Sequence, residues 1–571
     1  MREFFFKNNK KEFILAPLLK MTEAVFELLV PLVVAGIIDK GIANGDRAYV
    51  IRMTIVLIIF AVSGFAAAVT AQFFAAKAAG DCAKNMRSAL FFHIQKLSFR
   101  DRDKFGESTL LTRITDDVTQ VETGVNSVLR IVLRSPVVVI GAMIMAFIIN
   151  VQLAVIFAVI IPAVFLTVFL IMKATSPGYK KTQEKLDDLT LIVRENLTGM
   201  RVVRAFNRQE AEVKHFSREN KILTGIQKAT GIISALMNPL TYAIINIGVI
   251  ILLYAGAVKV NGGNLSQGEV VALYNYLSQI LVELLKLANL VVVMGKAFAG
   301  YRRAKEIMST KPSISDAGFD PASFGKGRSV EFENVSYSYG EASENALENI
   351  TFTAYSGEHI GIIGGTASGK STLVNMIPRI LDVRHGVVKV DGVDVREYSL
   401  RNLREKIGIV PQKALLFKGT IRGNVLYGKS DATDDEVWEA LRLAKADDFV
   451  REKDGGLDFM VERSGVNLSG GQRQRISIAR ALIRRPRILI LDDSASALDK
   501  ATESKLRKEI FNLDYNPIVF TVSQRVSSVM NADKIIVMDE GRISGIGTHD
   551  EMKAANSIYG EICKTQLREQ G

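Results

Sequence analysis

Apolar residues are concentrated in the first half of the chain, in runs long enough to cross a bilayer. The hydrocarbon core of a membrane is about 30 Å thick and needs roughly 20 apolar residues in a helix. The third and fourth runs are separated only around Asn150, which predicts a tight hairpin. We predict six membrane-spanning helices, near residues 14–38, 53–76, 131–149, 151–173, 232–257 and 269–298.

The polar segments between these runs alternate between short and long. Basic residues from Arg2 to Lys11 favour an N-terminus that stays in the cytoplasm. Every long segment then falls on the cytoplasmic side, and its helical pattern predicts that the second to fifth helices extend beyond the bilayer. The alternative is that these long segments are solvated loops and not helices. The turning points near residues 100–107 and 199–207 are candidate contact points for a cytoplasmic domain.

Charged residues inside two of the apolar runs are functional candidates, because burying a charge in a membrane is costly. Lys20, Glu23 and Glu27 share one face of the first predicted helix. Glu283 and Lys286 share one face of the sixth. Two interpretations stay open. The glutamates could line a polar cavity that attracts cationic substrates. Alternatively, Lys20 and Glu23 could lie at the inner interface of the membrane while Glu283 and Lys286 pair with each other near the cytoplasmic side.

The pattern changes after the sixth run. Residues 308–328 are polar and rich in Ser, Gly and Pro, which predicts a linker. It separates a membrane domain at 1–307 from a second domain at 329–571. There, an apolar strand-like run at 359–363 is followed by a glycine-rich stretch and then by helical spacing.

The glycine-rich stretch fits the phosphate-binding pattern G-x-x-x-x-G-K-[S/T]. In a strand–loop–helix context, backbone N–H groups close around phosphates at the positive end of a helix dipole. Lys370 would reach the β- and γ-phosphates, and Ser371 would hold Mg²⁺. The nucleotide site predicted from this stretch contains Gly364, Thr366, Ala367, Ser368, Gly369, Lys370, Ser371 and Thr372.

Three further signals follow the glycine loop. Gln412 ends an apolar strand, where an amide can reach Mg²⁺ or the attacking water. Residues 469–472 read Ser-Gly-Gly-Gln at the start of an amphipathic helix, which predicts a second anion-binding surface. The buried strand at 488–492 ends in Asp492, a typical ligand of the Mg²⁺ shell, and Asp493 follows it.

Composition narrows the function classes. Hydrophobic residues make up 48% of the 571 residues, and the net charge is +12. Many of the basic residues flank apolar runs, so a membrane explains the charge more economically than nucleic acid does. Cys82 and Cys563 are too few for a disulfide framework, a zinc site or an iron–sulfur site.

Together these motifs occur in the order and spacing of ABC transporter ATPase domains, and the whole chain resembles an ABC exporter half-transporter of the bacterial multidrug type. The resemblance implies a six-span α-helical membrane domain plus an α/β P-loop ATPase domain in the plasma membrane. It also implies two assembled chains, with ATP held between the Walker A loop of one and the signature helix of the other. Amphipathic drugs or lipids would be the substrates. The resemblance adds to the site the adenine-stacking Tyr339, the signature residues Ser469, Gly470, Gly471 and Gln472, the loop residue Asp499 and the Mg²⁺-shell residues Ser371, Gln412 and Asp492.

Two positions depart from the family pattern. Asp493 stands where the family usually has the glutamate that polarises water, and Gln524 replaces the switch histidine. Both affect one composite site while the signature is intact, which favours the degenerate subunit of a heterodimer. The alternatives are a homodimeric lipid or multidrug exporter with slow hydrolysis, and a nucleotide-gated channel or regulator. A soluble P-loop ATPase acting on nucleic acid is suggested only by charge.

Overall fold

The computed structural model describes residues 10–316, 318, 329–339 and 344–568. Two compact units result: the chain before Lys96 with Glu107–Thr310, and Lys96–Gly106 with the chain from Lys311 onward. The basic residues Arg2 and Lys7 of the N-terminus lie outside the described residues, as do residues 317 and 319–328 of the predicted linker.

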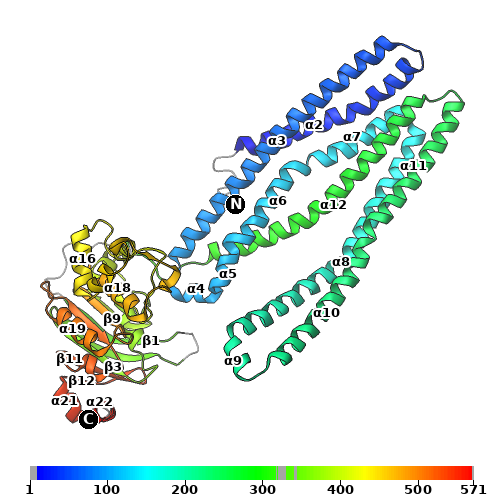
Figure 1. Ribbon diagram of the computed structural model, residues 1–571. Coiled ribbons are helices and arrows are strands. Elements are labelled where there is room, and N and C mark those ends of the chain that lie inside the picture. The colour runs from blue at the N-terminus through cyan, green and yellow to red at the C-terminus, as the bar shows by residue number, and fades with distance from the viewer. Residues whose placement is uncertain (1–9, 317, 319–328, 340–343, 569–571) are drawn as a thin grey trace. The chain divides into compact units, whose positions relative to one another are not determined.

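Within the described part of the first unit, six helical segments are long and apolar enough to cross a membrane. Each of the six predicted runs falls inside one of them, so the prediction of six spans is confirmed. The segments, drawn in Figure 1, contain α2 (Lys10–Gly36) with the π-helix η1 (Ile37–Ile42), α3 (Arg47–Lys96), α5 (Glu107–Thr112), the π-helix η2 (Arg113–Asp117), α6 (Val118–Ile131), α7 (Arg134–Ile149), α8 (Val151–Thr198), α10 (Gln209–Ala235), α11 (Met237–Asn261) and α12 (Gln267–Ser309).

The helices continue well past the apolar runs, as the helical pattern of the long segments predicted. The interval after the second run is helical through Lys96, and α8 continues through Thr198. Short helices form the two turning points, α4 (Phe99–Phe105) and α9 (Met200–Ala205). The loop alternative is therefore wrong. The predicted hairpin is also confirmed, because Asn150 alone separates α7 from α8 and its side chain accepts a hydrogen bond from the Leu153 N–H.

Helix α12 is central to the packing of the first unit, where it contacts α2, α6, α7 and α11 (Figure 1). The fully buried Tyr276 of α12 donates a hydrogen bond to the Leu28 carbonyl of α2 at 2.7 Å. The same two segments also meet near Asp39 of η1, which accepts hydrogen bonds from the Ser266 hydroxyl at 2.5 Å and the Gly268 N–H at 2.8 Å. A side chain at Gly268 would come within 2.4 Å of the Ala35 carbonyl oxygen, so this contact requires glycine.

The second unit contains a six-stranded and a four-stranded sheet. In the larger sheet all strands are parallel except the edge strand β12. Its order is β12 (Arg542–Gly547), β11 (Lys534–Asp539), β3 (His359–Gly364), β10 (Ile518–Val522), β9 (Ile488–Asp492) and β6 (Ile407–Val410). The antiparallel sheet has the order β2 (Leu347–Tyr355), β1 (Ser329–Tyr337), β4 (His385–Val390) and β5 (Val393–Asp394).

Apolar side chains of both sheets form one core, in which Phe352 of β2 packs against Phe332 of β1 and Phe520 of β10. A second core lies on the opposite face of β9 and β10, where Leu489, Leu491 and Val519 pack against helices. The remaining elements are α13 (Lys370–Met376), α14 (Leu400–Glu405), β7 (Gly419–Thr420), α15 (Ile421–Leu426), α16 (Asp434–Leu443), α17 (Asp447–Arg451), η3 (Gly456–Asp458), β8 (Met460–Val461), η4 (Arg463–Gly465), α18 (Gly470–Leu482), α19 (Lys500–Phe511), α20 (Val526–Val529), α21 (His549–Ala555) and α22 (Ser557–Arg568).

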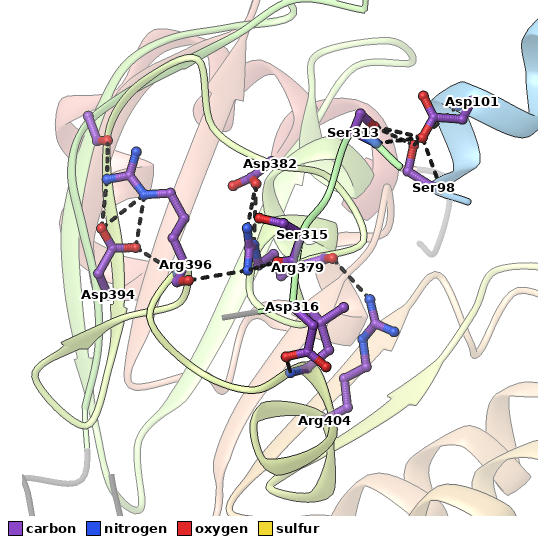
Figure 2. A network of polar contacts seen from close by, with 12 residues as sticks. Ser98, Asp101, Ser313, Ser315, Asp316, Arg379, Asp382, Asp394, Arg396 and Arg404 are labelled. Atoms are coloured by element: carbon purple, nitrogen blue, oxygen red, sulfur yellow. Dashed lines mark hydrogen bonds and ion pairs between the residues drawn. The ribbon is translucent and has the colours of Figure 1, made fainter. Parts of the chain in front are cut away.

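A polar network inside the second unit holds the segment that follows α12 (Figure 2). Asp101 of α4 is buried and accepts hydrogen bonds from the Ser313 N–H at 2.8 Å and from the hydroxyls of Ser313 and Ser98. Two residues further on, the Ser315 carbonyl accepts a hydrogen bond from the buried Arg379 guanidinium at 3.0 Å. We call the contacts among Ser98, Asp101 and Ser313 the α4 clasp.

Candidate functional site

A cavity of about 350 Å³ lies where three parallel strands end side by side. Strands β3, β10 and β9 are neighbours, and the carboxyl ends of parallel strands lie at one edge of a sheet, where ligands of open α/β folds bind. Most of the predicted site residues meet there. The cavity is lined by Tyr339, Ala346, Thr366, Ala367, Ser368, Gly369, Lys370, Ser371, Thr372, Gln412, Asp492, Asp493, Val522, Ser523 and Gln524.

The glycine loop connects β3 to α13, and at two of its positions, Gly364 and Gly369, there is no room for a side chain. A Cβ on Gly364 would come within 2.1 Å of the Met538 carbonyl oxygen. Gly369 has a φ of +95°, and a Cβ there would come within 2.7 Å of the Ala346 carbonyl oxygen. Both glycines are therefore needed for the loop to turn back over the end of the sheet.

Lys370 begins α13 and is buried within the loop. Its ammonium group donates hydrogen bonds to the carbonyls of Gly364 at 3.0 Å and Gly365 at 2.5 Å, and to the Ser368 hydroxyl at 3.2 Å. Burial lowers the pKa of Lys370, and the nearby carboxylates of Asp493 and Asp492 partly oppose this shift. A positive group is thus held in the loop, where a nucleotide phosphate would relieve the cost of its burial.

Asp492 and Ser371 meet across the cavity. The Ser371 hydroxyl donates a hydrogen bond to Asp492 Oδ1 at 2.8 Å. Burial raises the pKa of Asp492, and the adjacent Asp493 carboxylate raises it further, although Ser371 and Lys370 act in the opposite direction. Two carboxylates, a hydroxyl and the amide of Gln412 form an oxygen-rich set of the kind that Mg²⁺ prefers. The residues present therefore fit a magnesium ion.

Asp493 and Gln524, the two positions that depart from the family pattern, both line this cavity. The Gln412 amide donates a hydrogen bond to Asp493 Oδ2 at 3.2 Å. The backbone of Asp493 has a φ of +45°, and its N–H bonds to the Val522 carbonyl of β10. Gln524 follows β10 with its side chain exposed. The Asp493 carboxylate and the Gln524 amide thus lie beside the phosphate loop, just after the neighbouring strands β9 and β10.

Two tyrosines lie at the end of β1, and only Tyr339 lines the cavity. The rings of Tyr337 and Tyr339 meet edge to face with centroids 5.1 Å apart. Tyr337 is buried in the core, whereas Tyr339 is 57% exposed and its hydroxyl is 2.9 Å from the Thr372 hydroxyl. The Tyr339 ring is the one available to a nucleobase.

The signature residues lie elsewhere in the same unit. Ser469 caps α18, because its hydroxyl accepts a hydrogen bond from the Gln472 N–H while the Gln472 side chain accepts one from the Ser469 N–H. Asp499 caps α19 through the Thr502 N–H at 2.9 Å, and this hydrogen bond lowers the pKa of Asp499. None of Ser469, Gly470, Gly471, Gln472 and Asp499 lines the cavity. One chain therefore presents two separate surfaces, the cavity at the phosphate loop and the signature residues at the start of α18.

A charge cluster lies in the membrane unit, with Arg134 of α7 at its centre. Arg134 forms ion pairs with Glu27 of α2 and Glu283 of α12, both at 2.5 Å, and approaches Glu23 at 3.6 Å. Glu23 also pairs with Lys20 at 2.5 Å, and Glu283 with Lys286 at 2.8 Å. The expected pair of Glu283 with Lys286 is therefore confirmed. Arg134 is not among the charges predicted from the sequence, although a charge three residues into the third predicted span is a signal that could have identified it.

Comparisons with known proteins agree with this architecture. The family model of the ABC transporter transmembrane region matches residues 13–284, and that of the ABC transporter matches residues 347–496. A solved structure of a bacterial Atm1-family ABC exporter with ATP bound superimposes with a TM-score of 0.83 at 21% identity, covering 98% of this chain and 99% of that one. This likeness supports the fold.

Two relatives are similar over nearly the whole length. The uncharacterized ABC transporter ATP-binding protein YfiB of Bacillus subtilis is 35% identical over 98% of this chain and 96% of its own length. The ATP-dependent lipid A-core flippase of Salmonella typhimurium is 30% identical over 93% of this chain and 91% of its own. The chain therefore belongs to the ABC transporter family, in which an ATPase domain couples ATP hydrolysis to transport through a membrane domain.

Proposed function

We propose that this chain is the hydrolysis-impaired half of a heterodimeric exporter of amphipathic drugs or lipids. Its Walker side binds ATP and turns it over slowly, and its signature helix completes a competent site on the partner chain. The observation that carries the proposal is the meeting of Asp493 and Gln524 in the cavity that also holds Lys370, Ser371 and Asp492.

The chemistry of these two side chains explains the slow turnover. The carboxylate of Asp493 is one methylene shorter than that of glutamate, and a misplacement of about 1 Å can cost on the order of a hundredfold in rate. Gln412 holds that carboxylate from the other side of the cavity at 3.2 Å, which opposes its movement toward a water. Gln524 can donate a hydrogen bond to the γ-phosphate but cannot carry a positive charge.

The intact signature supports the second part of the proposal. The capping hydrogen bonds between Ser469 and Gln472 fix the first turn of α18, whose free N–H groups form an anion-binding surface. This surface does not line the chain's own cavity, so each complete site needs two chains.

Magnesium belongs to the same proposal. Ser371, Gln412 and Asp492 would hold Mg²⁺, which when bound neutralises charge on the β- and γ-phosphates. Lys370 supplies a second positive group from the phosphate loop, and Tyr339 supplies a ring for the adenine.

With the N-terminus and the ATPase domain in the cytoplasm, α4 and α9 act as the coupling helices. Closure of two ATPase domains over nucleotide then promotes the outward-facing state, and hydrolysis mainly at the partner's site resets it.

Steady-state ATP hydrolysis by the chain purified alone in lipid nanodiscs tests the proposal. The unmodified chain is expected to bind ATP and hydrolyse it at a negligible rate. Asp493→Glu is expected to raise the rate on the order of tenfold or more, and Asp493→Glu with Gln524→His to raise it further. Asp454→Glu makes the same change at an exposed position and should leave the rate unaltered.

Two results would contradict this function. Brisk turnover by the unmodified chain would show that Asp493 suffices and that a homodimer is the working form. Sustained single-channel currents gated by ATP would instead indicate a channel or regulator.

A further inference from the structure

Helix α22 packs against the segment that carries Gln524. Cys563 of α22 is buried in an apolar cluster with Val526 and Val529 of α20. Residues three and four apart lie on one face of a helix, so Gln566 continues the buried face of Cys563. Helix α20 begins at Val526, two residues after Gln524. The end of α22 therefore lies beside the turn between β10 and α20.

The side chain of Gln566 bridges two backbone groups of this turn. Its amide N–H donates a hydrogen bond to the Gln524 carbonyl at 2.8 Å, and its amide oxygen accepts one from the Val526 N–H at 2.8 Å. The Val526 N–H belongs to the first turn of α20, where N–H groups have no carbonyl partner within the helix. A side-chain amide supplies a donor and an acceptor at once, which is what this pair of backbone groups requires.

The direction of the Gln524 side chain depends on this backbone. Ser523, the preceding residue, is held to β3, because its N–H donates a hydrogen bond to the Ile362 carbonyl at 3.0 Å. The exposed Gln524 side chain lines the cavity that also contains Lys370. Within the described residues, no hydrogen bond fixes that side chain itself. The hydrogen bonds of Ser523 and Gln566 on either side therefore set where the Gln524 amide points.

We propose that Gln566 is a positioning residue for the nucleotide site, which acts through the backbone of Gln524 to aim its amide at the γ-phosphate. Hydrogen bonds weaken steeply when their angle departs from linearity, so a small rotation of the Gln524 backbone is enough to lose the contact. Gln566 lies 42 positions away in the sequence and does not line the cavity. This inference rests on the proposed role of Gln524 at the γ-phosphate and adds to that site a residue from α22.

Two nucleotides that differ at the γ-phosphate test the proposal. Binding of AMP-PNP, an ATP analogue that is not hydrolysed, and of ADP is measured by titration calorimetry with Mg²⁺ and the full chain in nanodiscs. Gln566→Ala is expected to weaken AMP-PNP binding about three- to tenfold and to leave ADP affinity unchanged, because the Gln524 amide acts on the γ-phosphate. Gln566→Glu keeps the length of the side chain but places an oxygen against the Gln524 carbonyl. It should weaken AMP-PNP binding at least about threefold even where Gln566→Ala disturbs α22.

Two further variants separate positioning from a general effect on the fold. Lys564→Ala shortens an exposed side chain on the same helix and should leave both affinities unaltered. Gln524→Ala should itself weaken AMP-PNP binding. Adding Gln566→Ala to it should have no further effect, because the amide that Gln566 positions is already gone. A purely structural role of Gln566 would instead lower affinity by the same factor in either chain.

Three results would overturn the proposal: AMP-PNP binding that is insensitive to both Gln566 variants or to Gln524→Ala, equal losses of AMP-PNP and ADP affinity, and a further loss when Gln566→Ala is added to Gln524→Ala. ATP hydrolysis by the unmodified chain is measured on the same nanodiscs. Brisk hydrolysis together with AMP-PNP binding that depends on Gln566 upholds the positioning role and overturns only the impaired heterodimer half. Negligible hydrolysis with AMP-PNP binding that ignores Gln566 overturns only the positioning role.

Discussion

Two adjacent glycines in the phosphate loop differ in what their surroundings allow. A side chain on Gly364 would collide with the Met538 carbonyl oxygen and come within 2.8 Å of the Ser368 hydroxyl. At Gly365 no heavy atom lies within 4 Å of the position that a Cβ would take. The phosphate-binding pattern fixes the first of these positions as glycine and leaves the second free, and the packing gives the physical reason.

Gly364→Ala is expected to destabilise the ATPase domain by about 1–3 kcal/mol, because backbone must shift to admit the methyl group. Trp438 of α16 is the chain's single tryptophan, so its fluorescence follows the unfolding of this domain alone. A thermal melt without nucleotide measures the effect. Gly365→Ala is the control and should change the midpoint little. Equal midpoints for the two variants would contradict the packing argument.

At the scale of elements, the α4 clasp joins a short helix to the segment that follows α12. Asp101 is 2% exposed and accepts its hydrogen bonds from two serines and from backbone N–H groups. Burial favours the neutral acid, but these hydrogen bonds outweigh it and lower the pKa of Asp101. The clasp therefore contributes stability above the unfolded pKa of about 3.9 and loses it only as the pH falls through the lower folded value.

Asp101→Asn is expected to loosen the clasp, because an amide accepts fewer hydrogen bonds than a carboxylate and the loss costs about 1–3 kcal/mol. Amide hydrogen exchange should quicken in α4 and around Ser313, while nucleotide affinity stays unchanged. Asp103→Asn removes an exposed carboxylate from the same helix and should leave the exchange rates unaltered. Accelerated exchange in both variants would indicate a general effect of charge on α4.

At the scale of the whole molecule, the sequence predicted more of the ATPase site than of the membrane interior. Parallel strands place their carboxyl ends together, so the meeting of Lys370, Asp492 and Gln524 follows from motif order. The role of Arg134 could not be predicted in the same way. Its partners Glu27 and Glu283 lie on helices far away in sequence, and their contact depends on how three helices are rotated against one another.

The orientation of the chain can be tested because its native thiols are shielded. Cys82 and Cys563 are both 1% exposed, so a maleimide should react slowly with the native protein. In intact cells, a membrane-impermeant maleimide is expected to label Asn264→Cys, between α11 and α12, and not Lys180→Cys on the extension of α8. Labelling should reverse in inside-out vesicles. Labelling of Lys180→Cys in intact cells would show that the orientation is opposite to the proposed one.

The order of strands in the six-stranded sheet also bears on the synthesis of the protein. Strand β10 lies between β3 and β9, yet it is made after both. Roughly 150 residues separate β3 from β10, and a ribosome adds about 5–20 residues per second, so β3 waits about 8–30 s for this neighbour. During that interval β3 lacks the strand that later joins it to β9, which is itself made only shortly before β10. Nascent chains that stop before β10 should therefore fail to bind nucleotide.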